Sequence, residues 1–414
     1  MIRQTLYILK KDLFMTTASV VGTAIAIMLV MTVMTAEIIK SAPMAPEISR
    51  NDLLYVKQVI LRQNNSTMYV PPSYPLCKKL IDIEGVEFAS LTGNNYANVQ
   101  SDFASEEIKL GVKTCDHHLW KIMSYDFLEG RPFSKEEFEA GAPCVVLSKH
   151  TAEQLFGGEP ALNKTVSIDD FDYTVVGVVK DVPSTFSHAA GKAWIPYKSD
   201  PNFDPENEQA WFSIMYYVPT KKAKKKVVEE VQAVVQRYNA TSDWELTLFG
   251  PYTHREEAYR VLSSEPTHIA AANWKLFLVL ALLFIIPAAN LSGFNNSRIK
   301  DRVEEIGIRQ AYGASRKSII SKLLMENLTL TFIGALIGFA GSFFLLFRLS
   351  KLLYWNGPVI PNHVDYDIPL NAAFSPYVLV TVLLTCVLLS FLSTIIPALS
   401  ATKQTITESL NQNR

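Results

Sequence analysis

Four long apolar runs that contain no charged residue stand out from the rest of the chain. They cover residues 13–36, 276–297, 327–347 and 378–399. A helix of about 20 apolar residues crosses the ~30 Å hydrocarbon core of a bilayer, so each run is long enough to span a membrane. Pro287 predicts a kink in the second run, close to Asn290, and Pro397 predicts a break near the end of the fourth. The pattern therefore predicts a membrane protein with four transmembrane α-helices.

Between the first and second runs, residues 37–272 are polar overall and mix two hydrophobic periodicities. Short runs rich in β-branched and aromatic residues predict strands at 86–91, 108–112, 144–147, 173–179 and 211–218. A helix is predicted over 221–239, because four valines share one face with lysines opposite them: Val227, Val231, Val234 and Val235. We therefore expect a large mixed domain, of α/β or α+β type, inserted between the first two spans.

Lysine and arginine positions indicate the orientation of these segments. Basic residues gather in three short segments, the start (1–12), the loop 298–322 and the tail 400–414. Short basic segments favour the cytoplasmic side, which places the 37–272 domain and the 348–374 loop outside the cytoplasm. A cleaved signal peptide is the alternative for the first apolar run. Its apolar region would be only ~7–15 residues long, followed by an A-x-A site, so the longer run without a clear A-x-A favours an uncleaved anchor.

The loop between the second and third apolar runs is a compact island of charge at residues 298–320. Its pattern predicts a short helix that lies in water at the membrane surface. Glu305 and Arg309 form an i,i+4 pair in the favourable order, Gly313 suits the helix end, and Ser315 can cap the next helix. From these features alone, an ordinary solvated surface helix explains the island as well as a functional one.

Small residues recur every four positions in two of the apolar runs. They are Ala18, Gly22 and Ala26 in the first run, and Gly334, Gly338 and Ser342 in the third. Such ridges let helices in a membrane approach each other closely. Both packing inside one subunit and a contact between two subunits fit this pattern.

Composition and cysteine count exclude several functional classes. The net charge of −1 gives no overall field that would attract nucleic acid. Cys77, Cys115 and Cys144 lie in the polar region, and both one disulfide among them and unpaired thiols remain open. His117 and His118 are the only metal-like cluster, and we expect a solvated pair and no metal site.

The sequence also contains no recognised catalytic string. G-x-x-x-x-G-K-[ST], G-x-S-x-G and H-E-x-x-H are all absent, so we expect a non-catalytic chain that binds no ATP itself. The apolar runs hold no ionisable residue, which argues against an ion-coupled carrier.

One long motif carries a family resemblance. Residues 305–315, EIGIRQAYGAS, resemble the E-I-G-[IV]-R-x-A-x-G-A signature of the MacB/FtsX-like permeases of ABC transporters. Two looser phrases, WKIMSYDFLEGRP at 120–132 and YTVVGVVKD at 173–181, are similar to the periplasmic core domain of that family. The resemblance implies that this domain has two lobes, one inserted in the other near 105–205.

In that family the signature segment is a coupling helix that docks on the ATPase subunit. The resemblance assigns this role to Glu304, Glu305, Ile306, Gly307, Ile308, Arg309, Ala311, Tyr312 and Gly313. On this hypothesis Glu305 orients Arg309 or meets a basic group of the ATPase. Ile306, Ile308 and Tyr312 would then supply the apolar contact.

The resemblance also implies partners and a location. It places the chain in a bacterial inner membrane as a multi-pass protein, with the large domain facing the periplasm. A separate ATPase chain would carry ATP and Mg, and a second permease chain, identical or paralogous, would complete a dimer in the lipid bilayer. A periplasmic adaptor and an outer-membrane channel are further possible partners. The expected function is export or extraction of a peptide, lipid, lipoprotein or drug-like substrate. The alternative is a signalling device that activates a cell-wall hydrolase without transport.

Overall fold

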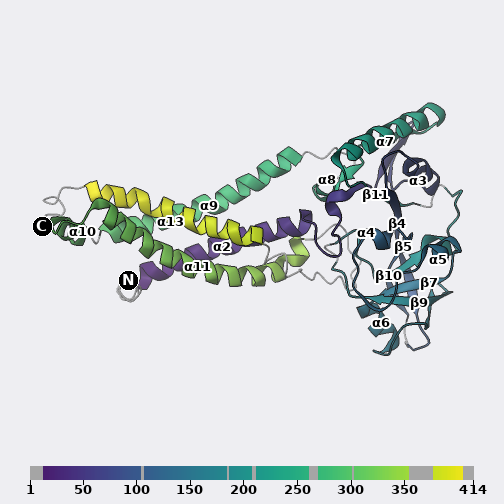
Figure 1. Cartoon of the computed structure of the whole chain (residues 1–414), viewed down its shortest axis with the longest axis horizontal. Helices are drawn as coiled ribbons and strands as arrows, with labels where there is room; N and C mark the ends of the chain where they lie inside the picture. The colour runs from purple at the N-terminus through teal and green to yellow at the C-terminus, as the bar shows by residue number, and fades with distance from the viewer. Residues whose placement is uncertain are drawn as a thin grey trace. The chain divides into compact units, whose positions relative to one another are not determined.

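A computed structural model describes the chain over residues 13–103, 107–183, 186–207, 211–260, 269–300, 303–353 and 376–403. These residues form two compact units. The α/β unit is built from Lys40–Ile269, and the helical unit from the described residues of 13–39, 270–353 and 376–403. Figure 1 shows the secondary structure of each unit.

Long helices make up the helical unit. They are α2 (Leu13–Ser41), α9 (Ile269–Lys300), α11 (Arg316–Leu353) and α13 (Pro376–Lys403), and the short α10 (Val303–Ala311) lies between α9 and α11. Among the described residues, Thr16–Ser41 and Arg316–Arg348 are long and apolar enough to cross a membrane, and Ile269–Ile285 is a shorter apolar helix. Two of the four predicted spans therefore meet the criteria of length and composition, and the four-span arrangement stays a prediction.

Helix α13 corrects one expectation, because it continues through Pro397 to Lys403 instead of breaking there. A proline removes one N–H from the helix, but an apolar helix tolerates this where neighbouring groups satisfy the freed carbonyl. Helix α9 is also continuous through Pro287, where the predicted kink stays a prediction, and it begins at Ile269, ahead of the predicted start of the second run.

The α/β unit contains two sheets. The smaller sheet has the order β12-β2-β3, and the larger sheet contains the other strands, with β13 and β6 at the ends of the strand order. The strands are β1 (Leu53–Val56), β2 (Val59–Gln63), β3 (Ser66–Val70), β4 (Phe88–Gln100), β5 (Ile108–Cys115), β6 (Phe127–Gly130), β7 (Cys144–Ser148), β8 (Thr165–Ile168), β9 (Phe171–Val179), β10 (Ala193–Pro196), β11 (Ser213–Tyr217), β12 (Glu245–Thr247) and β13 (Tyr252–Thr253).

Short helices connect these strands. They are η1 (Arg50–Asp52), α3 (Tyr74–Ile81), α4 (Leu119–Ile122), α5 (Lys135–Glu139), α6 (Lys149–Phe156), η2 (Tyr197–Ser199), α7 (Lys221–Thr241) and α8 (His254–Ala258). Side chains cap several of them: Ser134 and Thr253 each form a capping box, and Gly157 ends α6 in the left-handed conformation.

Part of the larger sheet closes on itself. β4 pairs with β5 and β8, β5 with β10, β10 with β7, and β9 with both β7 and β8, which completes a ring of six strands. One hydrophobic core fills this ring, drawn from residues between Ala97 and Ile195 and including Leu155 and Phe156 of α6. Residues 105–205 also contribute to the other core of this unit, among them Cys115, Phe133 and Trp194, so the expected division into two lobes stays a prediction.

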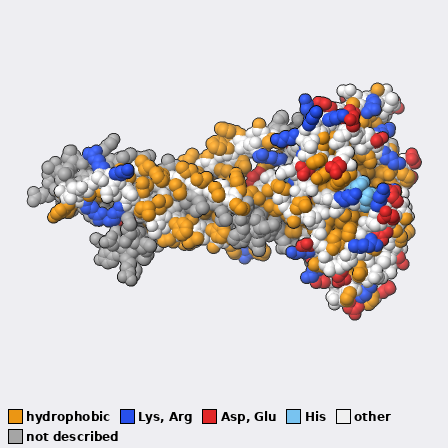
Figure 2. All heavy atoms as spheres, viewed as in Figure 1, with side chains coloured by type: hydrophobic (Ala, Val, Ile, Leu, Met, Phe, Trp, Pro, Cys, Tyr) orange, Lys and Arg blue, Asp and Glu red, His pale blue; other side chains and the backbone are white. Residues whose placement is uncertain are grey.

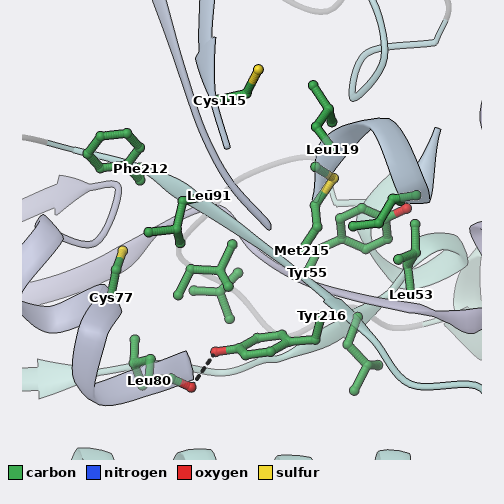
Figure 3. Packing of buried hydrophobic residues seen from close by; sticks show 14 of the residues in the cluster. Leu53, Tyr55, Cys77, Leu80, Leu91, Cys115, Leu119, Phe212, Met215 and Tyr216 are labelled. Atoms are coloured by element: carbon green, nitrogen blue, oxygen red, sulfur yellow. Dashed lines mark hydrogen bonds between the residues drawn. The ribbon is translucent and has the colours of Figure 1, made fainter. Parts of the chain in front are cut away.

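A second, larger core lies between α3, α7 and the strands β1, β11 and β4. Figure 3 shows part of it, where Leu53, Tyr55 and Met215 pack together and the Tyr216 hydroxyl donates to the Leu80 carbonyl at 3.1 Å. The predicted valine face of α7 is confirmed, because all four valines are buried in this core: Val227, Val231, Val234 and Val235.

Candidate functional site

The first candidate site is the elbow between α10 and α11, which contains the predicted coupling helix. Ile306 of α10 packs against Ile319 of α11, and both side chains are buried. Gly313 has φ +89°, a conformation that glycine adopts without strain and that ends α10 as predicted. The Ser315 hydroxyl accepts a hydrogen bond from the Ser318 amide at 3.3 Å, which caps α11 as expected.

The outward face of this elbow differs from the predicted one. Ile308 is 44% exposed and Tyr312 is 88% exposed, whereas Ile306 is only 5% exposed. Ile306 therefore holds α10 against α11 and is not available to a partner, which corrects the role expected for it. Figure 2 shows Lys and Arg side chains gathered at the end of the helical unit where Figure 1 labels α10.

The remaining predicted coupling residues fall on the same short helix. Gly307 is buried, Arg309 is half-buried, and Ala311 is exposed at the end of α10. Glu304 and Glu305 lie on α10, but their side chains fall outside the described part of the structure, so the proposed pairing of Glu305 with Arg309 stays a prediction.

The glycine ridge of α11 packs against α2 within one chain. A Cβ on Gly338 would stand 2.5 Å from the Ala24 carbonyl oxygen, and one on Gly334 would stand 2.8 Å from Thr23 Cβ. Ser342 is buried, with its Oγ 3.9 Å from Met31 Sδ. Of the two interpretations left open by the sequence, the structure supports packing inside one subunit.

The ridge predicted on α2 is not the surface that meets α11. A Cβ on Gly22 would meet nothing within 4 Å among the described residues, so Gly22 is not a position of close approach there. Ala18 is half-buried and Ala26 is buried. The four-residue spacing of small residues could not show which face of α2 is covered, because Thr23, Ala24 and Ile27 offer a second face.

Polar residues that the sequence analysis missed join α11 to α13. The Asn327 side-chain amide donates to Thr394 Oγ1 at 2.7 Å and to the Ser390 carbonyl at 3.3 Å. The Thr331 and Ser390 hydroxyls lie 3.0 Å apart. Such hydrogen bonds hold apolar helices together where water is excluded. The sequence feature that could have predicted this contact is the pair Asn327 and Thr331, which lie one helical turn apart in a largely apolar run.

The second candidate site is a buried polar cluster in the α/β unit. Glu47 and Arg50 form a salt bridge of 2.8 Å in which both side chains are fully buried. The second Glu47 oxygen accepts from the amides of His188 and Ala189 at 2.9 and 3.0 Å, and Arg50 Nη1 donates to the Ala42 carbonyl at 2.7 Å. A buried ion pair is tolerated when its remaining hydrogen-bonding groups find such partners.

Two histidines and a lysine extend this cluster. Nε2 of His254 lies 3.0 Å from the Lys40 carbonyl oxygen and Nδ1 lies 3.3 Å from the Tyr55 hydroxyl. Tyr55 stacks on His188 with ring centroids 4.1 Å apart, and Lys113 Nζ donates to the His188 carbonyl at 2.5 Å. Burial lowers the pKa of His254 to about 4, the pKa of His188 well below its ordinary value, and the pKa of Lys113 to about 8.

We name this cluster the polar clamp, consisting of Glu47, Arg50, Lys113, His188 and His254. It ties residues 40–50, where the chain leaves α2, to the loop at 186–189, to β5 and to the first residue of α8. The chain therefore enters the α/β unit and begins to leave it at one buried polar centre. Sequence could not reveal this, because His188 and Glu47 are 141 positions apart.

The structure also shows the state of the three cysteines and of the histidine pair in the polar region. Cys77, Cys115 and Cys144 are free thiols, all buried. His117 and His118 are half-buried with rings 4.0 Å apart, and they contact Phe138 and Phe88, so the expected solvated pair is wrong. No group of His, Cys, Asp or Glu among the described residues could hold a metal ion.

Comparison with known proteins identifies the family. Residues 16–234 match the MacB-like periplasmic core domain, and residues 276–406 match the FtsX-like permease C-terminal domain. These two matches together cover both units, and the chain is a membrane permease component. The chain belongs to the MacB/FtsX-like permeases of ABC transporters.

Individual relatives are distant. An uncharacterized ABC transporter permease, YknZ of Bacillus subtilis, is 22% identical over 63% of this chain and 63% of its own length. The macrolide export ATP-binding/permease protein MacB of Chromobacterium violaceum is 21% identical over 64% of this chain and 41% of its own length. The matched stretch thus spans less than two thirds of either relative. Among solved structures, the periplasmic region of MacB from Actinobacillus actinomycetemcomitans aligns with a TM-score of 0.35 and 13% identity over 47% of this chain and 89% of that chain.

Proposed function

We propose that this chain is a permease subunit that couples ATP hydrolysis on a separate ATPase to motion of its α/β unit outside the cytoplasm. The observation that carries this proposal is the elbow. It presents Ile308 of α10 and Tyr312, the residue after α10, to solvent, and α10 is fixed to α11 through Ile306. An exposed aromatic side chain on a rigid helix end is a feature of protein contacts. The family match supports an ABC ATPase as the partner.

A continuous series of contacts could carry motion from this elbow. Helix α10 is packed on α11, and α11 approaches α2 closely at Gly334 and Gly338. Helix α2 continues directly into residues 42–50, which the polar clamp holds to the core of the α/β unit. On this proposal, a displacement of α2 is passed along the chain to residues 42–50 and from there to the clamp.

The rest of the assembly follows from this proposal. Four spans in a bacterial inner membrane would place both termini and the elbow in the cytoplasm and the α/β unit in the periplasm. A second permease chain would complete a dimer in the lipid. The substrate would be a peptide, lipid, lipoprotein or drug-like molecule handled outside the cytoplasm, so that the spans need no polar passage.

The test is a pair of matched tyrosine variants in the complete complex. Tyr312→Ala removes the exposed ring of the elbow, and Tyr377→Ala removes another exposed ring at the start of α13, the two being 88% and 63% exposed. We expect Tyr312→Ala to reduce permease-stimulated ATP hydrolysis and ATPase co-purification in mild detergent about tenfold, the loss of an interface anchor of ~1.4 kcal/mol or more. Tyr377→Ala should leave both unchanged.

A second variant tests the geometry of the elbow. Gly313→Val places a β-branched residue at φ +89°, where it is strained, and should redirect the start of α11. If both Tyr312→Ala and Gly313→Val insert, remain folded and stimulate hydrolysis like the unmodified chain, the elbow is an ordinary surface loop and the proposal fails.

A further inference from the structure

Strand β3 forms an open edge of the smaller sheet. It pairs only with β2 among the described strands, and its residues Ser66, Thr67, Met68 and Tyr69 are exposed. Edge strands in soluble domains are usually protected by lysine, proline or a bulge. This strand has none of these within it, and the sequence contains no charged residue between Arg62 and Lys78. The edge is therefore able to pair with another strand.

Hydrogen-bond alternation identifies which groups face outward. The β2–β3 hairpin has a two-residue turn at Asn64 and Asn65, with φ +53° at Asn64, and it pairs Gln63 with Ser66. The pair that closes a two-residue hairpin is hydrogen-bonded, and hydrogen-bonded pairs then alternate along the ladder. The backbone groups of Ser66 and Met68 therefore point toward β2. Those of Thr67 and Tyr69 point away from it.

The hydrophobic core continues up to this edge. Met68 is paired with Leu61 of β2, and Leu61 is paired with the buried Leu246 of β12, so the three side chains share one face of the sheet. Leu246 and Leu61 belong to the larger core, yet Met68 is 41% exposed. An added strand would cover Met68 and extend the same core by one position.

We propose that β3 pairs antiparallel with β3 of a second copy of this chain, about a two-fold axis at Met68. In this register Met68 faces Met68 of the second copy, and Thr67 faces Tyr69 in both directions. The outward groups of Thr67 and Tyr69 then form the hydrogen-bonded pairs, while Met68 occupies the non-hydrogen-bonded pair, as the alternation requires. This inference rests on the two-copy assembly of the proposed function.

Charge favours a second copy over an unrelated strand. Self-pairing brings identical residues together, so any charge on the edge would repel itself. The edge carries no charge, and Arg62 behind it is already opposite Glu245 across the sheet. An uncharged edge offers nothing to select a charged foreign segment. Two copies held in one membrane complex also meet at a high effective concentration.

The experiment is disulfide cross-linking of single-cysteine additions in the full chain in native membranes. A non-hydrogen-bonded antiparallel pair has its Cα atoms about 4.5 Å apart, which suits a disulfide. We expect Met68→Cys to form a covalent dimer under mild oxidation about tenfold faster than Ile48→Cys. Ile48 is a control in the same unit that is more exposed than Met68, at 54% against 41%. Thr67→Cys should also be slow, because its own copy is not directly opposite in this register.

A double variant and the size of the complex separate the outcomes. Adding Thr67→Pro to Met68→Cys removes an outward N–H that the chain itself does not use, so folding should persist and cross-linking should be lost. Equal rates for Met68→Cys and Ile48→Cys, or a cross-link to a different protein, would overturn the inference. A complex with two copies that does not cross-link at Met68 defeats this contact alone, whereas a complex with one copy also defeats the proposed assembly.

Discussion

The polar clamp shows why single buried residues matter in this molecule. An ion pair removed from water gains little net stability, but removing one partner leaves an uncompensated charge that costs roughly 3–5 kcal/mol. Glu47 and Arg50 are fully buried, and their remaining hydrogen-bonding groups reach the backbone of distant segments. The clamp therefore fixes which segments meet, more than it adds stability.

Acid should weaken the α/β unit through His254. Its pKa is lowered from 6.5 to about 4 because the ring is buried beside Arg50. Below pH 6.5 the His254 ring is protonated in the unfolded chain but stays neutral in the folded chain. The free energy of unfolding therefore decreases as the pH falls from 6.5 toward 4. Between pH 7.5 and 5 we expect a loss of about 2 kcal/mol from this residue, seen as a fall of roughly 5 °C in the melting temperature.

The variant His254→Gln isolates this contribution, because glutamine does not titrate. Its melting temperature should fall less between pH 7.5 and 5 than that of the unmodified chain, whereas His150→Gln on α6 should keep the full decrease. Asp116 acts in the opposite direction, since burial raises its pKa to about 6. Below about pH 6 the folded chain takes up this proton before the unfolded chain does, so Asp116 offsets part of the loss between pH 7.5 and 5, and it does so in all three proteins. Identical pH dependence in His254→Gln and the unmodified chain would contradict the assignment.

The sequence predicted individual residues where local geometry decides their role. Gly313 and Ser315 were identified because a helix end and a helix cap depend on neighbours within a few positions. Ile306 was misassigned because periodicity places it on a face without saying what covers that face. The contact between Glu47 and His188 could not be predicted from local pattern, because only folding brings these two distant residues together.

At the scale of elements, long periodic segments were predictable and short strands were not. The predicted strands correspond to β4, β5, β7, β9 and β11, and α7 was placed to within two residues. The other strands were missed. Each has only two to five residues, as in Ala193–Pro196, and so carries few alternating positions. Their strand structure depends on neighbours distant in sequence, as in the parallel pairing of β10 with β5.

The close contact of α11 with α2 gives a prediction with a matched control. Gly338→Ala would place a methyl group 2.5 Å from the Ala24 carbonyl oxygen, so the helices must separate. We expect a loss of about 1–3 kcal/mol from this overpacking, measured as lower thermal stability in detergent. Gly22→Ala is the control, because the same methyl group meets nothing within 4 Å and alanine favours a helix. Equal effects of the two variants would show that this contact does not hold the helices together.

At the scale of the whole molecule, the chain belongs to the MacB/FtsX-like permeases, and its described residues fall into two units. The described residues hold no metal cluster, and the sequence has no phosphate-binding loop. Within the helical unit, contacts join α10 to α11 and α11 to α2, and within the α/β unit the polar clamp joins residues 40–50 to distant segments. Family membership was recognisable from eleven residues of sequence, but the order of these contacts required the fold.

The proposed orientation gives the final prediction. If the elbow is cytoplasmic and the α/β unit is outside, the two sites must differ in access to a reagent that cannot cross the membrane. Cysteines are introduced at Ser315 and at Asn202, both exposed in their own units. In sealed spheroplasts an impermeant maleimide should label Asn202→Cys and leave Ser315→Cys unlabelled until the membrane is opened. The unmodified chain gives the background, to which the buried Cys77, Cys115 and Cys144 contribute little. Labelling of Ser315→Cys in sealed spheroplasts would reverse the orientation or change the number of spans, and the elbow could then not meet a cytoplasmic ATPase.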